Sequence, residues 1–213
     1  MAHGSIRPGV RSPYENAARL PDAEHVDVGS LASGAWTELE IGPGPKAGFL
    51  VERVVAAETA ALVGLEIRKK WASVGDTRLA KLGFAARARV FCEDARAALP
   101  RLRPDASVRR VFLHFPDPWW KKRHQKRLVV GDIFLAEVAR LLEKGGDLYI
   151  QTDVEERAEL YENAVLAHGA FEPAGEREGS ARITDNPFGA RSPRERRAIA
   201  DGLPVFRLLF RRR

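Results

Sequence analysis

The fold of this chain is decided by the stretch WTELEIGPGPKAGFLVERVVAA, residues 36–57. Residues 36–41 are predicted to form the first core strand, residues 42–48 a glycine-rich turn, and residues 49–57 a helix. A strand, such a turn and a helix open a nucleotide-binding α/β unit, because glycine lets the backbone approach a ligand and the start of the helix offers free N–H groups. The stretch therefore predicts a ligand site at the turn, although a lone Gly-x-Gly is weak evidence by itself.

Two carboxylates accompany this turn. Glu40 lies two residues before Gly42 and suits a ligand with a positive end, such as the amino and sulfonium groups of S-adenosylmethionine. Glu66 comes 26 positions after Glu40, at the end of the strand predicted over residues 61–67. A carboxylate placed about 20 residues beyond such a turn holds a ribose diol, because two acceptor oxygens match two vicinal hydroxyls. The alternative for Glu66 is an exposed side chain before a helix.

The rest of the chain alternates between strands and helices. Further strands are predicted over residues 88–92, 107–114, 147–152 and 202–210, and helices over residues 68–82, 96–99, 132–142 and 154–168. Gly145-Gly146 is expected to close the helix over residues 132–142, and residues 172–194 are expected to form a long loop. This alternation predicts an α/β fold with a mostly parallel sheet.

Acidic residues stand at five of the predicted strand ends. They are Glu40, Glu66, Asp94, Asp117 and Asp153. Because the carboxyl ends of the strands of an open parallel sheet line the ligand crevice, we expect these acids to meet at one site. Asp94 could accept a hydrogen bond from an adenine amino group, and it would serve equally well as a helix N-cap.

The stretch FPDPWWKKRHQKR, residues 115–127, combines one acid, two tryptophans and five cations. The two prolines end the preceding strand and present Asp117 in a rigid turn. Aromatic rings beside Arg and Lys are what a site needs to stack a base and to neutralise phosphate. The alternative is a strand end with buried tryptophans and a solvated basic loop, but the combination favours a nucleic-acid site.

Composition points to an anionic partner. The chain has 213 residues, a net charge of +6 and a pI of about 9.8, which favour nucleic acid first and a membrane surface second. Residues 177–213 alone contain ten Arg and four acids. The single cysteine, Cys92, excludes an intrachain disulfide and a cysteine-based zinc site, and no signal peptide or membrane-length apolar run is seen. A reducing, cytoplasmic setting is therefore expected.

The two ends of the chain are expected to differ from the α/β core. Residues 1–34 are predicted to be a basic, partly ordered arm, with one short helix around residues 14–20, and residues 35–213 to form the domain. Near the other end, Ser192 is predicted to cap a short helix, with Glu195 three residues later completing a capping box.

From about Leu39 to the C-terminus, the sequence resembles the bacterial tRNA (guanine-N7)-methyltransferases, which are class I, S-adenosylmethionine-dependent enzymes. The motifs that carry the resemblance are FPDPW at 115–119 with the cations after it, EIGPG at 40–44, GLE at 64–66, DA at 94–95, TD at 152–153 and GLPVFRL at 202–208. The resemblance implies a Rossmann-like class I methyltransferase fold, with a doubly wound, mostly parallel sheet and an antiparallel C-terminal strand.

The resemblance also assigns roles to residues. It implies that the cofactor is held by Glu40, Gly42, Gly44, Glu66, Asp94 and Asp117. It implies that Asp117 is also the catalytic residue, and that Lys121 and Asp153 contact the target guanosine. RNA contacts are implied for Arg123, His124, Lys126 and Arg127. The implied target is a guanine in the variable loop of tRNA, and no metal, no membrane and a monomer or homodimer are expected.

The sequence departs from the family pattern in two places. Gly48 comes late in the glycine-rich turn, which resembles a one-residue insertion. The family also carries a Thr-x-x-Glu substrate motif shortly before the last strand, and here Ser192 and Glu195 take that place, with Arg194 where an aromatic residue is usual. Thr184 is the rival for the threonine position. The competing functions are a class I methyltransferase acting on another acceptor and a non-catalytic RNA-binding protein that keeps the fold.

Overall fold

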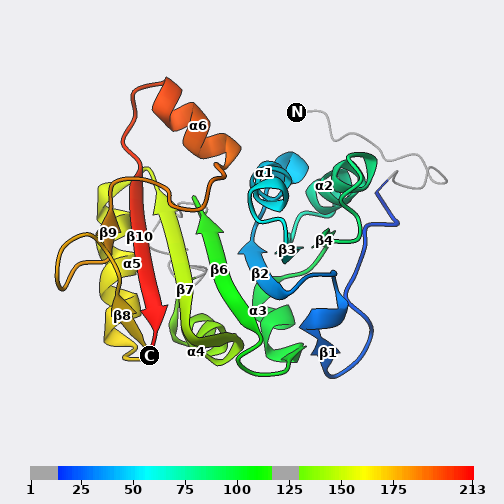
Figure 1. Cartoon of the computed structure of the whole chain (residues 1–213), viewed down its shortest axis with the longest axis horizontal. Coiled ribbons are helices and arrows are strands. Elements are labelled where there is room, and N and C mark those ends of the chain that lie inside the picture. The colour runs from blue at the N-terminus through cyan, green and yellow to red at the C-terminus, as the bar shows by residue number, and fades with distance from the viewer. Residues whose placement is uncertain (1–13, 117–129) are drawn as a thin grey trace, which may run out of the picture.

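The computed structural model describes residues 14–116 and 130–213, and it is built around one twisted sheet of eight strands (Figure 1). The strands are β2 (Trp36–Ile41), β3 (Ala60–Leu65), β4 (Ala88–Phe91), β6 (Val108–His114), β7 (Leu142–Thr152), β8 (Phe171–Pro173), β9 (Arg182–Ile183) and β10 (Phe206–Arg212). Their order is β4-β3-β2-β6-β7-β10-β8, and β9 pairs with β10. The five strands from β4 to β7 are parallel, whereas β10 runs antiparallel to β7. The predicted doubly wound sheet with an antiparallel C-terminal strand is confirmed.

Helices cover both faces of the sheet. They are α1 (Gly48–Ala56), α2 (Lys69–Lys81), α3 (Ala95–Ala98), α4 (Asp132–Leu141), α5 (Glu155–Ala167) and α6 (Pro193–Ala200). Helices α1 and α2 pack on one face through residues such as Phe49, Leu50 and Leu79. Helices α3, α4 and α5 pack on the other face, which holds the larger apolar cluster. Figure 1 shows α6 beyond the carboxyl ends of β6 and β7, where it can reach a ligand at that edge.

The region before the sheet is joined to the domain. Strand β1 (Val26–Asp27) pairs in parallel with β5 (Leu102–Arg103), and Leu20 and Val28 are buried in the larger apolar cluster. The helix predicted around residues 14–20 is wrong, because only residues 14–16 form a turn. Its backbone bonds to the domain instead: Cys92 N–H donates to Ala18 O at 2.7 Å, and Leu20 N–H donates to a Glu93 carboxylate oxygen at 3.1 Å.

The role predicted for Gly145-Gly146 is also wrong. Helix α4 ends at Leu141, and both glycines lie inside β7. Gly145 has a φ of +79°, and a Cβ on Gly146 would stand 2.9 Å from the carbonyl oxygen of Arg109. The pairing of β6 with β7 shifts register at this point, so the glycines form a bulge rather than a helix end.

The loop expected over residues 172–194 is wrong in part: its start overlaps β8, it contains β9, and both strands pair with β10. In the part of the chain that the structure describes, no helix combines the length and the apolar character needed to cross a membrane.

Candidate functional site

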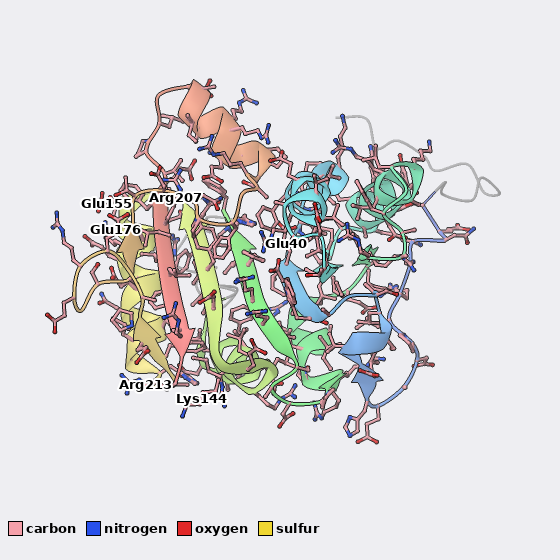
Figure 2. All side chains as sticks on the ribbon, viewed as in Figure 1. Glu40, Lys144, Glu155, Glu176, Arg207 and Arg213 are labelled. Atoms are coloured by element: carbon pink, nitrogen blue, oxygen red, sulfur yellow. The ribbon has the colours of Figure 1, made fainter. Side chains whose placement is uncertain are left out.

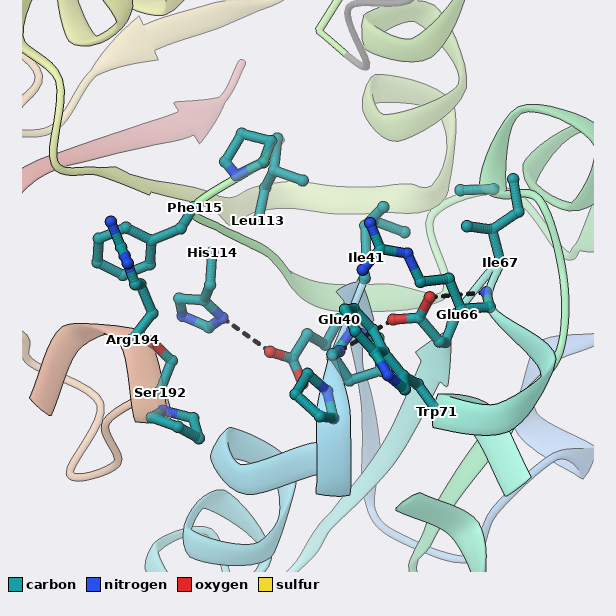
Figure 3. Close-up of a pocket in the computed structure, with 18 of the residues that line it drawn as sticks. Glu40, Ile41, Glu66, Ile67, Trp71, Leu113, His114, Phe115, Ser192 and Arg194 are labelled. Carbon is teal, nitrogen blue, oxygen red and sulfur yellow. Dashed lines mark hydrogen bonds and ion pairs between the residues drawn. The ribbon is translucent and has the colours of Figure 1, made fainter. Parts of the chain in front are cut away.

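A cavity of about 1020 Å³ lies at the carboxyl edge of the parallel strands. Its walls come from the ends of β2, β3, β4, β6 and β7 and from the start of α6. Figure 3 places Arg194 and Ser192 at one end of this cavity and Glu66 and Trp71 at the other, with Glu40 between them. Four of the five predicted strand-end acids therefore line one cavity: Glu40, Glu66, Asp94 and Asp153.

Glu40 stands in the wall of the cavity and is almost completely buried. Its Oε1 atom lies 2.8 Å from Nδ1 of His114, which comes from the neighbouring strand β6 (Figure 3). Its Oε2 atom is buried and has no hydrogen-bond partner, and Nε2 of His114 is in the same situation. A buried carboxylate oxygen without a partner is costly, so this position is suited to receive a donor or a cation from a ligand.

Glu66 holds the glycine-rich turn in place. Its Oε2 accepts the N–H of Gly44 at 3.0 Å, and its Oε1 accepts the N–H of Arg68 at 2.8 Å. Gly42 and Gly44 have φ values of +71° and +69°, which glycine adopts without steric cost. The carboxylate thus links the turn to the end of β3 at the wall of the cavity.

The unusual part of the turn is Pro45–Ala47, which forms a single 3-10 turn before α1. Lys46 and Ala47 have φ values of 68° and 47°, in the region that favours glycine. Each such residue costs roughly 1–2 kcal/mol. Ala47 is fully buried and packs against Gly75 of α2. A Cβ added to Gly75 would lie only 3.0 Å from the Cβ of Ala47. Packing on α2 therefore holds the inserted segment in a strained form.

Asp94 fulfils the structural role that the sequence left open. It caps α3 by accepting the N–H of Arg96 at 3.0 Å, and it forms an ion pair with the Arg96 guanidinium at 2.9 Å. The hydrogen bond from the Arg96 side chain is the main reason why the pKa of Asp94 lies below its usual value of 3.8. Asp94 also lines the cavity, so its predicted contact with a ligand stays a prediction.

Trp71 was not predicted as a site residue. It lies on the first turn of α2 and lines the cavity, and the Arg68 guanidinium lies 3.9 Å from the centroid of its ring. Its position after Glu66 could have suggested an aromatic wall, but the helical spacing alone does not distinguish a cavity-lining side chain from a core one.

At the other end of the cavity, Asp153 follows β7 and forms an ion pair with Arg194 of α6. Ser192 also lines this end and caps α6, because its Oγ accepts the N–H of Glu195 at 3.1 Å. Thr184 is not part of the cavity wall. Its N–H and hydroxyl both donate to Glu176, at 2.7 and 2.8 Å. The geometry thus favours Ser192 over Thr184 for the family's threonine position.

Glu195 faces the interior rather than the cavity. It is fully buried, and its Oε1 accepts hydrogen bonds from Arg207 at 2.9 and 3.1 Å. Its Oε2 accepts one from Asn186 at 3.1 Å. Arg207 lies at the start of β10, below α6 (Figure 2). Glu195 therefore anchors α6 to the sheet, and its predicted contact with substrate stays a prediction.

A second buried ion pair lies on β2, the strand that also carries Glu40. Glu38 accepts from Arg53 at 2.7 Å through each of its oxygens and from Arg110 at 2.8 Å. Burial alone would raise the pKa of Glu38, but the hydrogen bonds and charges of Arg53 and Arg110 hold it below its usual value of 4.5. Arg53 also donates to the carbonyl oxygen of Phe188, which ties this pair to the segment before α6.

Six predicted site residues lie outside the described residues: Asp117, Lys121, Arg123, His124, Lys126 and Arg127. The segment that leads to them starts in the cavity wall, because Phe115 and Pro116 line it. Phe115 has a φ of 45°, a conformation that costs a non-glycine residue roughly 1–3 kcal/mol and is common at functional sites. Among the described residues, no three His, Cys, Asp or Glu side chains are grouped so as to hold a metal ion.

Comparisons with known proteins identify a family and several relatives. A family model described as "Putative methyltransferase" matches residues 35–208. The tRNA (guanine-N(7)-)-methyltransferase of Anaeromyxobacter dehalogenans is 40% identical over 179 residues, which cover 83% of this chain and 85% of the relative. The protein of the same name from Synechococcus sp. is 33% identical over 195 residues, covering 92% of this chain and 75% of the relative.

Solved structures are similar in fold. The 16S rRNA methyltransferase KamB aligns with a TM-score of 0.55 and 16% identity, covering 86% of this chain and 89% of KamB. The aminoglycoside resistance methyltransferase NpmB1 aligns with a TM-score of 0.52 and 16% identity, covering 86% of this chain and 90% of NpmB1. At these identities the likeness concerns the fold alone, and it confirms the predicted class I methyltransferase fold.

Proposed function

The chain belongs to the tRNA (guanine-N7)-methyltransferase family, and we propose that it transfers a methyl group from S-adenosylmethionine to N7 of a guanine in the variable loop of tRNA. The observation that carries the proposal is the buried, unpartnered Oε2 of Glu40 in the wall of a cavity of about 1020 Å³. Ligand cavities commonly have volumes of about 300–1,000 Å³, so this one has room for a cofactor and a base.

The residues at one end of the cavity fit S-adenosylmethionine. Glu40 offers a free carboxylate oxygen to a positively charged group, as the amino and sulfonium groups of this cofactor require. Glu66 would hold the ribose diol and Asp94 the adenine amino group, while Gly42 and Gly44 keep side chains out of the cofactor's path. The bound cofactor supplies an electrophilic methyl group on a sulfonium centre.

The residues at the other end fit a guanine. Asp153 is a carboxylate that can accept from the N1–H and 2-amino donors of the base, and Ser192 adds a hydroxyl. Guanine N7 is an unprotonated ring nitrogen and needs no general base, so catalysis consists largely of positioning N7 in line with the methyl group. Asp117 is proposed to stabilise the positive charge that develops on the purine ring.

The cations after Asp117 are proposed to bind the RNA backbone. Lys121 would contact the target guanosine, while Arg123, Lys126 and Arg127 would neutralise phosphates next to it, which makes tRNA binding steeply dependent on salt. Glu195 would support this site through α6. We place the enzyme in the cytoplasm with its substrate, as a monomer or homodimer.

The experiment that tests this proposal uses an unmodified tRNA transcript, methyl-labelled S-adenosylmethionine and strand cleavage chemistry specific for 7-methylguanosine. Label and cleavage should appear together at one variable-loop guanine, and a transcript with adenine at that position should acquire neither. Label without cleavage would favour a methyltransferase for another base, and cofactor binding without label would favour a different acceptor. Absence of cofactor binding would favour an RNA-binding protein without catalysis.

A further inference from the structure

The ion pair between Arg194 and Asp153 lies in the wall of the cavity, at the end formed by α6 and β7. Arg194 belongs to α6 and Asp153 follows β7, so two distant parts of the chain meet here. Both residues line the cavity, and the exposed fractions of their side chains are 55% and 18%. The carboxylate proposed to recognise the guanine is thus engaged by a side chain of the protein itself.

This contact is held by a rigid support. Ser192 and Glu195 fix the first turn of α6, and Glu195 is anchored to Arg207 on β10. On the opposite side, the Pro193 ring packs against the start of α1, where a Cβ on Gly48 would come within 2.3 Å of it. The backbone of residue 194 is therefore held at the cavity, and only its side chain is free to change place.

The guanidinium of Arg194 resembles the Watson–Crick edge of guanine in its hydrogen-bond donors. A guanidinium presents N–H donors on adjacent nitrogens of one planar carbon centre. The Watson–Crick edge of guanine presents its N1–H and 2-amino donors from the same kind of nitrogen–carbon–nitrogen unit. A carboxylate that pairs with a guanidinium can therefore pair in the same way with the Watson–Crick edge of guanine. Adenine lacks both donors, so it cannot replace the guanidinium in this way.

We propose that Arg194 is a specificity-determining residue, which occupies Asp153 in the empty enzyme and is displaced by the Watson–Crick edge of guanine. The inference rests on the proposed function, since it takes Asp153 as the acceptor for the target base. A base can enter only if its donors replace those of Arg194. Adenine offers Asp153 only its 6-amino donor and would leave one carboxylate oxygen without a partner after the exchange, so the pair excludes it more strongly than it excludes guanine.

Binding of guanosine to the protein saturated with S-adenosylhomocysteine tests this role without tRNA. Guanosine has no phosphate, so its affinity reports the competition for Asp153 and not attraction to the charge of Arg194. A partly exposed ion pair is worth about 0.2–1 kcal/mol, so Arg194→Ala should tighten guanosine binding by about 1.4- to 5-fold. Titrations followed by NMR measure affinities in this weak range.

Arg197→Ala is the matched control. Arg197 lies on the same helix, is 77% exposed, pairs with Asp201 and is not part of the cavity wall. Its replacement removes the same charge and should leave guanosine affinity unchanged. Asp153→Asn should weaken guanosine binding and abolish the difference between Arg and Ala at position 194. Adenosine affinity should gain more than guanosine affinity from Arg194→Ala, so the selectivity for guanosine should fall.

The inference is overturned if Arg194→Ala weakens guanosine binding, or leaves it equal to that of Arg197→Ala, in proteins that unfold at the same temperature as wild type. It is also overturned if the effect of Arg194→Ala persists in the Asp153→Asn background. Methyl transfer to tRNA is measured on the same samples. Normal transfer with an unchanged guanosine affinity would refute only the role of Arg194, whereas absence of transfer by wild type would refute the proposed function.

Discussion

Two glutamates of β2 provide a matched pair for separating fold from function. Glu38 and Glu40 point to the same face of the sheet because they are two residues apart on one strand, and each is only 1% exposed. Glu38 is paired with Arg53 and Arg110, whereas Oε2 of Glu40 has no partner. Replacement of Glu38 by glutamine should therefore lower stability, whereas replacement of Glu40 should lower cofactor affinity.

For Glu40→Gln we expect a loss of cofactor affinity with no loss of stability. A hydrogen bond to a charged group is worth about 1.5–3 kcal/mol, so the dissociation constant of S-adenosylmethionine should rise roughly 10- to 150-fold. The amide can keep the contact with His114, and a neutral group replaces an unpartnered buried oxygen. The free energy of unfolding should stay the same or rise by about 1 kcal/mol.

For Glu38→Gln we expect a loss of stability with no loss of cofactor affinity. Removing this charge leaves Arg53 buried without its ionic partner, and breaking a buried pair costs about 3–5 kcal/mol. For a chain of this length that corresponds to a fall in the melting temperature of roughly 6–20 °C. Glu38 is not in the cavity wall, so the cofactor affinity of the folded protein should stay within about twofold of wild type.

Calorimetric titration with S-adenosylmethionine and thermal unfolding without it, on wild type and both variants, give an affinity and a stability for each of the three proteins. Titrations belong at a temperature at which all three proteins are folded. The reasoning is refuted if Glu40→Gln binds the cofactor as wild type does, or if it loses as much stability as Glu38→Gln.

Three further results are expected. The folded-state pKa of Glu38 lies below its usual value of 4.5. The stability that Glu38 contributes is therefore fully present above pH 4.5 and is lost as the pH falls through the folded-state pKa. Unfolding curves should show that the difference in free energy of unfolding between wild type and Glu38→Gln shrinks below about pH 4.5. Gly48→Ala should lower the free energy of unfolding by about 1–3 kcal/mol, because the new Cβ collides with Pro193, and should raise KM for tRNA by displacing α6. Unchanged stability would contradict that packing. Asp117→Asn should reduce turnover more than tRNA binding, and an equal loss of both in steady-state and filter-binding assays would contradict its catalytic role.

The convergence of the acidic residues could be predicted because it follows from one rule. Parallel strands place their carboxyl ends at the same edge of a sheet, so Glu40, Glu66, Asp94 and Asp153 had to approach one another once the strands were recognised. Their partners could not be predicted. His114 meets Glu40 across 74 positions only because β6 lies beside β2, and this strand order is not visible in local patterns.

Other differences arose where long-range contacts override local signals. Residues 14–20 have helical composition, but Ala18 and Leu20 bond to residues 92 and 93 instead of to their own segment. Gly145-Gly146 resembles a helix stop, yet it accommodates a bulge against β6. Glu195 was predicted as a substrate residue beside Ser192, and its pairing with Arg207 required knowledge of how β10 packs. Helix capping by Ser192 is local and was predicted correctly.

The most direct test of the central claim asks whether N7 is the acceptor atom. It measures single-turnover methyl transfer to two tRNAs, one with guanine and one with 7-deazaguanine at the variable-loop position. Our account predicts that the 7-deaza tRNA binds within about twofold of the guanine tRNA but acquires no methyl group, because a C–H replaces the nucleophilic nitrogen. Methylation of the 7-deaza tRNA would contradict the account.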